Sequence, residues 1–183
     1  MFTVHHKTAY ETKGFTLIEL MVTVAIAGIV LTIGVPSFSQ VLKNSRLASN
    51  TNSLIASLNL ARSEAVKRKV KVFVRRKGSV SQNWDDGWDV FIDLNANEEF
   101  NDGTDTLLKT FSSITDGYTL RSGANYDDWI AFLPSGFNDG SGSSNNDSFG
   151  LCAAAGDTEN SRKISVNRVG RARVSTGDVT TCP

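Results

Sequence analysis

The sequence predicts an α+β protein in which one long N-terminal helix packs on an antiparallel β-sheet domain. Three features of the 183-residue chain support this fold class. An apolar segment lies near the N-terminus. Neither glycine nor proline occurs between Pro36 and Gly78, so a helix can run far beyond that segment. From Val70 onward, short β-branched and aromatic segments alternate with polar ones, which is typical of strands and turns.

The apolar segment spans residues 15–35, and Glu19 is the only charge within it. As a helix it would be about 31 Å long, which matches the hydrocarbon thickness of a bilayer. No secretory-type cleavage site follows it, so we expect it to remain as the membrane-spanning first half of the helix. A carboxylate at membrane depth is costly unless it is paired, which makes Glu19 a candidate functional residue. An ordinary single-pass anchor that tolerates the glutamate is the alternative.

The helix is expected to continue to residue 69, with a kink at Pro36. Its second half carries an apolar stripe on one side. This stripe needs a partner surface, and the β-rich remainder of the chain offers a sheet. A coiled-coil seam is the alternative. The stripe consists of Leu47, Leu54, Leu58, Ala61 and Ala65.

Residues 70–183 are expected to form one β-rich globular domain. Its strands are separated by polar connections, and the connection at 137–148 is expected to be mobile. Three tryptophans, Trp84, Trp88 and Trp129, are expected in the core or on a sheet face rather than as platforms for nucleobases. The predicted strands are 70–76, 88–94, 106–111, 118–122, 129–133, 149–152, 163–167 and 171–175.

The net charge is zero, but positive charge is concentrated near the C-terminus. A turn at 168–170 between the last two strands would place two arginines outward, roughly 7 Å apart, with Ala172 and Val174 toward the core. Guanidinium groups suit phosphate oxygens, so this hairpin can bind a nucleic acid through its backbone. A solvated strand face is the alternative. Residues 161–177 contain no acid and five basic residues, namely Arg162, Lys163, Arg168, Arg171 and Arg173.

The chain contains two cysteines, Cys152 and Cys182. An even number of cysteines in a domain that reaches an oxidising compartment predicts a disulfide. The bridge would close a loop of about 30 residues, worth roughly 3 to 4 kcal/mol in the chain-entropy treatment. Because this loop encloses the basic segment, we expect the bridge to hold the arginines in place. Two free thiols or a metal pair are the alternative.

Residues 13–20 read Lys-Gly-Phe-Thr-Leu-Ile-Glu-Leu. This stretch resembles the prepilin signature of type IV pilins and type II secretion pseudopilins. The resemblance implies that a prepilin peptidase removes residues 1–14 by cleavage between Gly14 and Phe15, and that the new amino terminus of Phe15 is N-methylated. It also implies that this amine neutralises Glu19 of a neighbouring subunit as pilins assemble into a helical filament.

Enzymatic activity is not expected. The only histidines, His5 and His6, lie in the segment that the peptidase would remove. The remaining chain then lacks the base of a Ser-His-Asp or Cys-His nucleophile system and has no histidine for a metal site. The carboxylates of Asp85, Asp86 and Asp89 could imitate an acid and base pair, but the sequence places no pocket around them.

A second acidic segment begins at Asp93 and starts like a calcium-binding loop. It departs from an EF-hand because Glu98 stands where the loop has glycine, and because Asp105 is shorter than the glutamate that closes such a loop. We therefore expect a solvated hairpin loop, and neither a metal nor another cofactor.

Three further segments resemble the FimT and GspH group of minor pilins and pseudopilins. Together with the apolar helix they extend this resemblance over nearly the whole chain, which implies the type IV pilin-like fold. The segments are Asn-Leu-Ala-Arg-Ser-Glu-Ala at 59–65, Trp-Asp-Val-Phe-Ile-Asp at 88–93 and Val-Gly-Arg-Ala-Arg at 169–173.

Within the last segment, Gly170-Arg171-x-Arg173 matches the Gly-Arg-x-Arg motif of FimT-type minor pilins, which are implicated in binding DNA during natural transformation. The resemblance assigns that role to Gly170, Arg171 and Arg173. Positive charge and proximity, rather than the motif, add Arg162, Lys163 and Arg168 as DNA-binding candidates.

The resemblance thus implies a minor type IV pilin that binds DNA without sequence preference. It would be anchored by a single span in the bacterial inner membrane, with its C-terminal domain in the periplasm, before it enters the pilus. A structural pseudopilin of the type II secretion system is the alternative. A third possibility is a minor pilin that primes assembly and has no ligand of its own.

Overall fold

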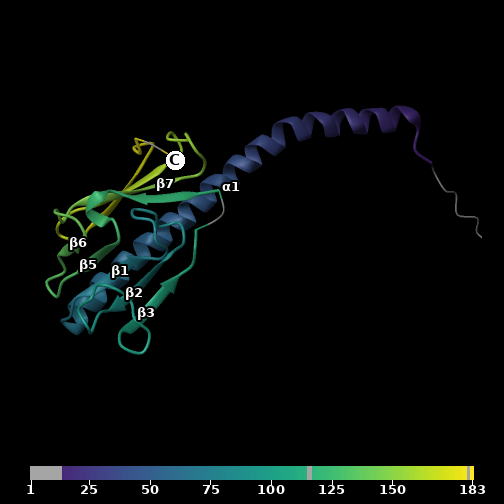
Figure 1. Ribbon diagram of the computed structural model, residues 1–183. Coiled ribbons are helices and arrows are strands. Elements are labelled where there is room, and N and C mark those ends of the chain that lie inside the picture. Colours follow the sequence, from purple (N-terminus) through teal and green to yellow (C-terminus); the bar gives the residue numbers. More distant parts are fainter. Residues whose placement is uncertain (1–13, 115–116, 181) are drawn as a thin grey trace, which may run out of the picture. The chain divides into compact units, whose positions relative to one another are not determined.

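Helix α1 (Leu17–Arg68) is one unbroken helix, as predicted for residues 15–69. The computed structural model describes residues 14–114, 117–180 and 182–183. The chain divides into two units, residues 1–41 and 42–183, and α1 contributes to both. Figure 1 shows this helix and the strands that follow it along the chain.

The first unit contains the apolar part of α1. The helix begins with an N-cap, because the Thr16 hydroxyl accepts a hydrogen bond from the Glu19 amide at 3.2 Å. The helix is long and apolar enough to cross a membrane, judged by length and composition. Pro36 lies inside the helix without ending it. The kink expected there stays a prediction.

The second half of α1 buries the predicted stripe. Leu47, Leu54, Leu58, Ala61 and Ala65 are all buried and belong to the main hydrophobic core of the second unit. The same core contains residues of the β-rich part of the chain, among them Val74 of strand β1 (Val72–Arg76) and Phe149 of strand β7 (Asp147–Cys152). The stripe therefore packs against sheets, as expected, and not in a coiled-coil seam.

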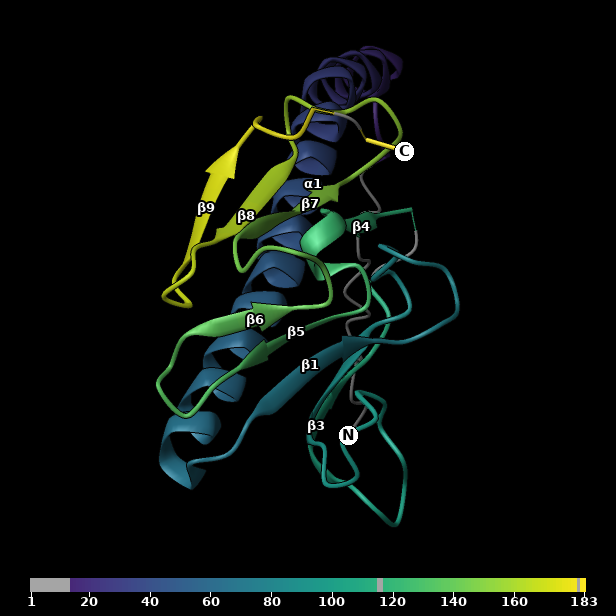
Figure 2. The same cartoon turned by 60° about the vertical axis from the view of Figure 1, so that its left-hand side comes forward.

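In the described part of the chain, nine strands form two antiparallel sheets. The first has the order β3-β2-β1-β5-β6 and the second the order β4-β7-β8-β9. Figure 2 shows strands of both sheets in front of the domain part of α1. The strands are β1 (Val72–Arg76), β2 (Trp88–Ile92), β3 (Thr106–Phe111), β4 (Thr119–Ser122), β5 (Trp129–Phe132), β6 (Asn138–Gly140), β7 (Asp147–Cys152), β8 (Arg162–Val166) and β9 (Ala172–Thr176).

All eight predicted strands are present, but β6 lies in the connection that was expected to be mobile. The expectation of a mobile connection is wrong for β6, because Asn138 is buried and β6 pairs with β5. The sequence Asn-Asp-Gly has low strand propensity, so tertiary contacts rather than local preference determine this strand.

The tryptophans lie in the core, as predicted. Trp84 and Trp88 pack in the main cluster, and Trp129 belongs to a smaller aromatic cluster with Phe73 and Phe91. These rings are buried, so none of the three tryptophans offers an exposed face to a ligand.

Candidate nucleic-acid interface

The last two strands, β8 and β9, form the predicted hairpin at one edge of the second sheet. Val166 lies opposite Ala172, and the connecting residues 167–171 are called here the hairpin tip. The Gly170 amide donates to the Asn167 carbonyl at 2.8 Å, and the Arg171 amide donates to the Asn167 side chain at 2.9 Å. The turn predicted at 168–170 is thus present, and Asn167 caps it.

Three arginines are exposed at this end of the hairpin. Arg168 and Arg171 belong to the tip, and Arg173 is the second residue of β9. Among the described residues, none of these three guanidinium groups lies in an ion pair with a carboxylate. Their charge is therefore available to an anion, and phosphate oxygens suit the guanidinium geometry.

The arginines line two neighbouring grooves that share Asn146. Arg171 and Arg173 line the first groove, and Arg168 lines the second. Asp147 is the acid of the first groove, and its carboxylate accepts hydrogen bonds from the backbone amides of Asn125 and Ser148, at 2.8 and 2.7 Å. The other lining side chains are mainly hydroxyls and amides, from Ser143, Ser144, Asn145, Ser148, Ser165 and Asn167.

The orientation expected for β9 is correct, but the expected burial of Val174 is wrong. Ala172 and Val174 lie opposite Val166 and Ile164, as predicted, and Ala172 packs on the core. Val174, however, is 46% exposed. The reason is that β9 is the edge strand of its sheet, so no further strand covers this end of the core.

Two of the candidate cations lie at the opposite end of the hairpin. Arg162 faces Thr176 and donates to the carbonyls of Asn160 and Ser161, at 2.8 and 3.1 Å. Lys163 pairs with Asp178 at 3.4 Å. The structure thus brings Arg168, Arg171 and Arg173 together, whereas Arg162 and Lys163 are engaged elsewhere.

The hairpin tip rests on the turn between β5 and β6. Gly170 has a φ of +73°, which favours glycine, and it lies against the carbonyl of Gly136 and the ring of Phe132. Arg62 of α1 donates from Nε to the same Gly136 carbonyl at 3.1 Å. Helix α1 therefore supports the hairpin tip through the turn between β5 and β6.

A buried polar network also reaches the tip. Asn138 donates from its side chain to the Tyr126 hydroxyl at 2.6 Å, and that hydroxyl donates to the Val166 carbonyl at 3.3 Å. The Asn138 amide donates to the Arg168 carbonyl at 3.3 Å. Burial raises the pKa of the Tyr126 phenol, and the negative charge of Asp147 raises it further. The phenol therefore stays protonated and can donate.

The predicted disulfide between Cys152 and Cys182 is present, with a Cα–Cα distance of 5.7 Å. It lies at the end of β7 that pairs with Thr119, whereas the hairpin tip lies beyond the other end of β7, where Asp147 faces Val166. The bridge and the arginines thus lie at opposite ends of β7, and the expectation that the bridge holds the arginines in place stays a prediction that this arrangement does not support.

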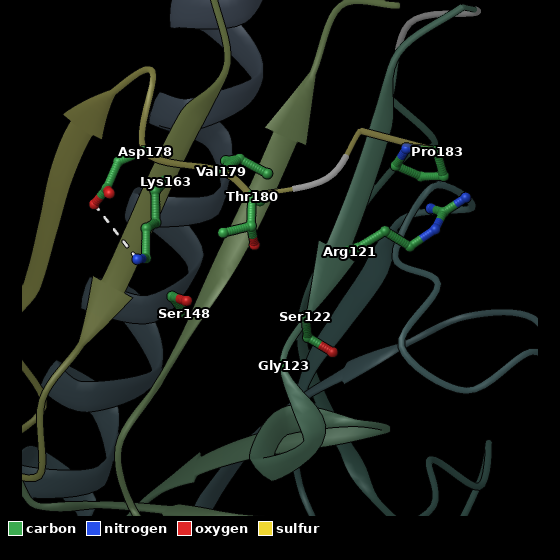
Figure 3. A pocket seen from close by; sticks show the side chains of 10 residues that line it. Arg121, Ser122, Gly123, Ser148, Lys163, Asp178, Val179, Thr180 and Pro183 are labelled. Carbon is green, nitrogen blue, oxygen red and sulfur yellow. Dashed lines mark ion pairs between the residues drawn. The ribbon is translucent and has the colours of Figure 1, made fainter. Parts of the chain in front are cut away.

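Residues 178–180, which follow β9, lie over the outer face of the second sheet (Figure 3). Val179 packs at Gly150, where a Cβ would come within 3.0 Å of the valine side chain. Figure 3 shows Asp178, Val179 and Thr180 above β8 and β7, beside a hollow that Lys163 and Arg121 line. Both cations are paired, with Asp178 and Asp85 respectively, so this hollow carries little free positive charge.

The processing and assembly candidates lie in the first unit. Gly14, Phe15 and Glu19 are exposed, and Glu19 lies in the first turn of α1. Residues 1–13, which include His5 and His6, lie outside the described residues. The cleavage site and the role of Glu19 stay predictions.

The acidic loop between β2 and β3 satisfies its own carboxylates with backbone amides. Asp93 accepts hydrogen bonds from the amides of Asn95, Ala96 and Glu98, and Asp105 accepts from Leu94 and Asn101. Within the described residues, no group of three or more His, Cys, Asp or Glu side chains is arranged to hold a metal ion.

This fold, a long apolar N-terminal helix packed on antiparallel sheets, defines a type IV pilin-like subunit. The chain belongs to the family described as type II transport protein GspH, which matches residues 50–170. Residues 12–35 match the prokaryotic N-terminal methylation motif. The family consists of structural pilins and pseudopilins, so the chain is anchored through its apolar helix and assembles with other pilins.

Two crystal structures of the type IV minor pilin FimU from Pseudomonas aeruginosa share the fold. The first aligns with a TM-score of 0.61 and 18% identity, over 76% of this chain and 96% of FimU. The second, in another crystal form, gives 0.58 and 19%, over 74% and 99%. No curated protein matches the chain in sequence. At these identities the structural likeness supports the fold.

Sequence reasoning missed the residues that support the tip. Arg62 was part of the segment 59–65 that carries the family resemblance, but its contact with Gly136 depends on a turn 74 positions away. The sequence around Asn138 does not predict its burial, because an asparagine in a polar segment is typical of an exposed loop. Phe137 was the one large apolar residue of that segment, and the structure leaves it exposed.

Proposed function

We propose that this protein is a minor type IV pilin that binds DNA through its C-terminal hairpin. The observation that carries the proposal is the group of three exposed arginines, Arg168, Arg171 and Arg173, none of which lies in an ion pair with a carboxylate among the described residues. They line adjacent grooves and present several guanidinium groups along one surface. Such a surface binds the phosphate backbone without reading sequence, with affinity that falls as salt rises.

The match of Gly170-Arg171-x-Arg173 to the FimT-type motif supports the same proposal from the sequence side. Gly170 adopts a left-handed conformation that favours glycine, and it directly precedes the first of the two motif arginines. Arg168 joins them from the other side of the turn. Arg162 and Lys163, being engaged at the far end, contribute less.

The proposal is tested with residues 42–183, because every buried core residue and the disulfide lie in that unit. Duplex DNA binding is measured over a series of salt concentrations. Arg171→Gln with Arg173→Gln is expected to weaken binding and to reduce the slope of log K against log salt by about 2.

The matched control is Arg46→Gln with Lys109→Gln, which removes two exposed positive charges elsewhere on the same unit. The control should retain most of the affinity and of the salt slope. The proposed interface is wrong if the hairpin variant binds duplex DNA like the unmodified protein. It is also wrong if the hairpin variant and the control variant lose the same amount of affinity.

The N-terminus supplies the assembly function in this proposal. A prepilin peptidase cleaves between Gly14 and Phe15, the amine of Phe15 is methylated, and it pairs with Glu19 of a neighbouring subunit. The domain then faces the periplasm before it enters the pilus. Mass spectrometry of the mature protein should find an N-terminal methylated Phe15, and an intact leader would contradict this route.

A second candidate is a structural subunit of a type II secretion filament, which the family description favours. It uses the same helix and needs no DNA. Deletion of the gene separates the two functions, since loss of transformation with normal protein release supports the first, and the reverse supports the second.

A further inference from the structure

Phe137 differs from every other aromatic residue in the described part of residues 42–183. It is the only one of them that is exposed, with 48% of its surface accessible. The domain buries its remaining rings in two clusters or at their margins. An isolated exposed phenyl ring is ordinary by itself, so its position decides whether it has a function.

The position is beside the hairpin tip. Gly136, which precedes Phe137, lies against Gly170, and the amide of Asn138, which follows it, donates to the Arg168 carbonyl at 3.3 Å. Both chain neighbours of the ring therefore touch the tip that carries the arginines. Figure 2 shows the turn between β5 and β6 on the same side of the domain as the turn between β8 and β9.

The backbone around Phe137 is firmly held. Its carbonyl accepts a hydrogen bond from the Leu133 amide at 2.8 Å, which closes the turn. Arg62 binds the Gly136 carbonyl, and Asn138 is anchored to Tyr126 in the core. Because successive side chains of an extended segment alternate, the buried Asn138 leaves Phe137 directed outward. The ring is thus presented on a preorganised turn.

We propose that Phe137 is a stacking platform for a nucleobase, and that the preferred ligand of this surface is therefore single-stranded DNA. This inference rests on the proposed DNA-binding function and deepens it. Arginines along a groove hold the phosphates, while an exposed aromatic ring beside them receives an unpaired base. In a duplex the bases stack on each other and are unavailable, so the ring adds affinity only for a single strand.

The test compares a 12-nucleotide oligothymidine with a 12-base-pair duplex, by fluorescence anisotropy on residues 42–183. Phe137→Ala should weaken single-strand binding at least about fivefold, as expected for the loss of one stacked base. Duplex binding should stay unchanged, because the arginines are intact. Phe137→Trp should preserve or strengthen single-strand binding, whereas Phe137→Leu, which keeps an apolar side chain but loses the aromatic face, should weaken it.

Leu94→Ala is the matched control, since it removes an exposed apolar side chain from the loop after β2. It should leave both affinities unchanged. The stacking proposal is overturned if Phe137→Leu binds the single strand as well as the unmodified protein, or if Phe137→Ala affects neither DNA.

The second of these outcomes would leave the ring as a contact for another protein. Failure of the stacking proposal can be told apart from failure of the proposed DNA-binding function. If the DNA-binding function is wrong, the Arg171 and Arg173 double variant will bind the duplex as well as the unmodified protein. The two proposals can therefore fail separately.

Discussion

Gly170 lies so close to the carbonyl oxygen of Gly136 that a Cβ on Gly170 would be 2.8 Å from that oxygen. The same Cβ would be 2.9 Å from the ring of Phe132. Neither neighbour can yield easily, because one is backbone held by Arg62 and the other is buried. This contact connects the arginine-bearing tip to the first sheet, so glycine is required here for packing as well as for its positive φ.

Gly170→Ala is therefore expected to displace the tip and weaken DNA binding without any change of charge. Its free energy of unfolding should fall by more than the roughly 1 to 2 kcal/mol that a left-handed non-glycine residue costs. Chemical denaturation and duplex titration measure the two effects.

Gly103→Ala is the matched control for this variant. Gly103 has a similar φ of +81°, but nothing lies within 4 Å of the position that a Cβ would take there. It should show the conformational cost alone and bind DNA normally. Equal destabilisation by the two substitutions would show that the contact with Gly136 contributes nothing.

The helix, its buried stripe and all eight predicted strands could be read from the sequence because each has a periodic signal. Leu58 and Ala61 recur at helical spacing, and the strands alternate or run apolar. Strand β6 could not be predicted from the sequence. Asn138 has a low strand propensity, and its hydrogen bond to Tyr126, a contact between separate segments, holds it in place.

The site was predictable in part for a similar reason. Arg171 and Arg173 belong to a local motif, and a hairpin brings them together by short-range geometry. Arg162 and Lys163 lie at the other end of the same hairpin. Their engagement there by the Asn160 and Ser161 carbonyls and by Asp178 carries no local signal in the sequence. The support from Gly136 and the exposure of Phe137 depend on contacts between distant segments, which local patterns do not contain.

The disulfide is expected to stabilise the domain without determining DNA binding. Cys152→Ser with Cys182→Ser should lower the free energy of unfolding by roughly 3 to 4 kcal/mol, from the entropy of closing a loop of about 30 residues. Duplex affinity well below the melting temperature should be retained, because the bridge lies at the far end of β7 from the tip.

Urea unfolding and duplex titration at low temperature check these two outcomes for the cysteine variant. Reduction of the unmodified protein serves as the control, since it breaks the same bridge without substitution. If the fully folded variant loses DNA affinity, the bridge has a role at the tip that its position argues against.

Tyr126 gives the domain a specific dependence on alkaline pH. Its phenol is buried, and its pKa is raised in the folded state by burial and by the charge of Asp147. The folded protein therefore holds this proton more tightly than the unfolded chain, whose tyrosine pKa is about 10. The resulting stabilisation is complete below pH 10 and is lost as pH rises toward the folded pKa, at up to about 1.4 kcal/mol per pH unit.

Tyr126→Phe should remove this dependence but lower stability at pH 8. The buried side-chain amide of Asn138 loses its acceptor, which costs about 1 to 3 kcal/mol. Between pH 10 and 11.5 the unmodified protein should then lose stability faster than Tyr126→Phe in urea unfolding, because only the unmodified protein has this phenol to ionise. Lysines titrate in both proteins, so their contribution cancels in the comparison. Parallel losses in the two proteins would mean that the Tyr126 phenol is not held in its protonated form by the fold.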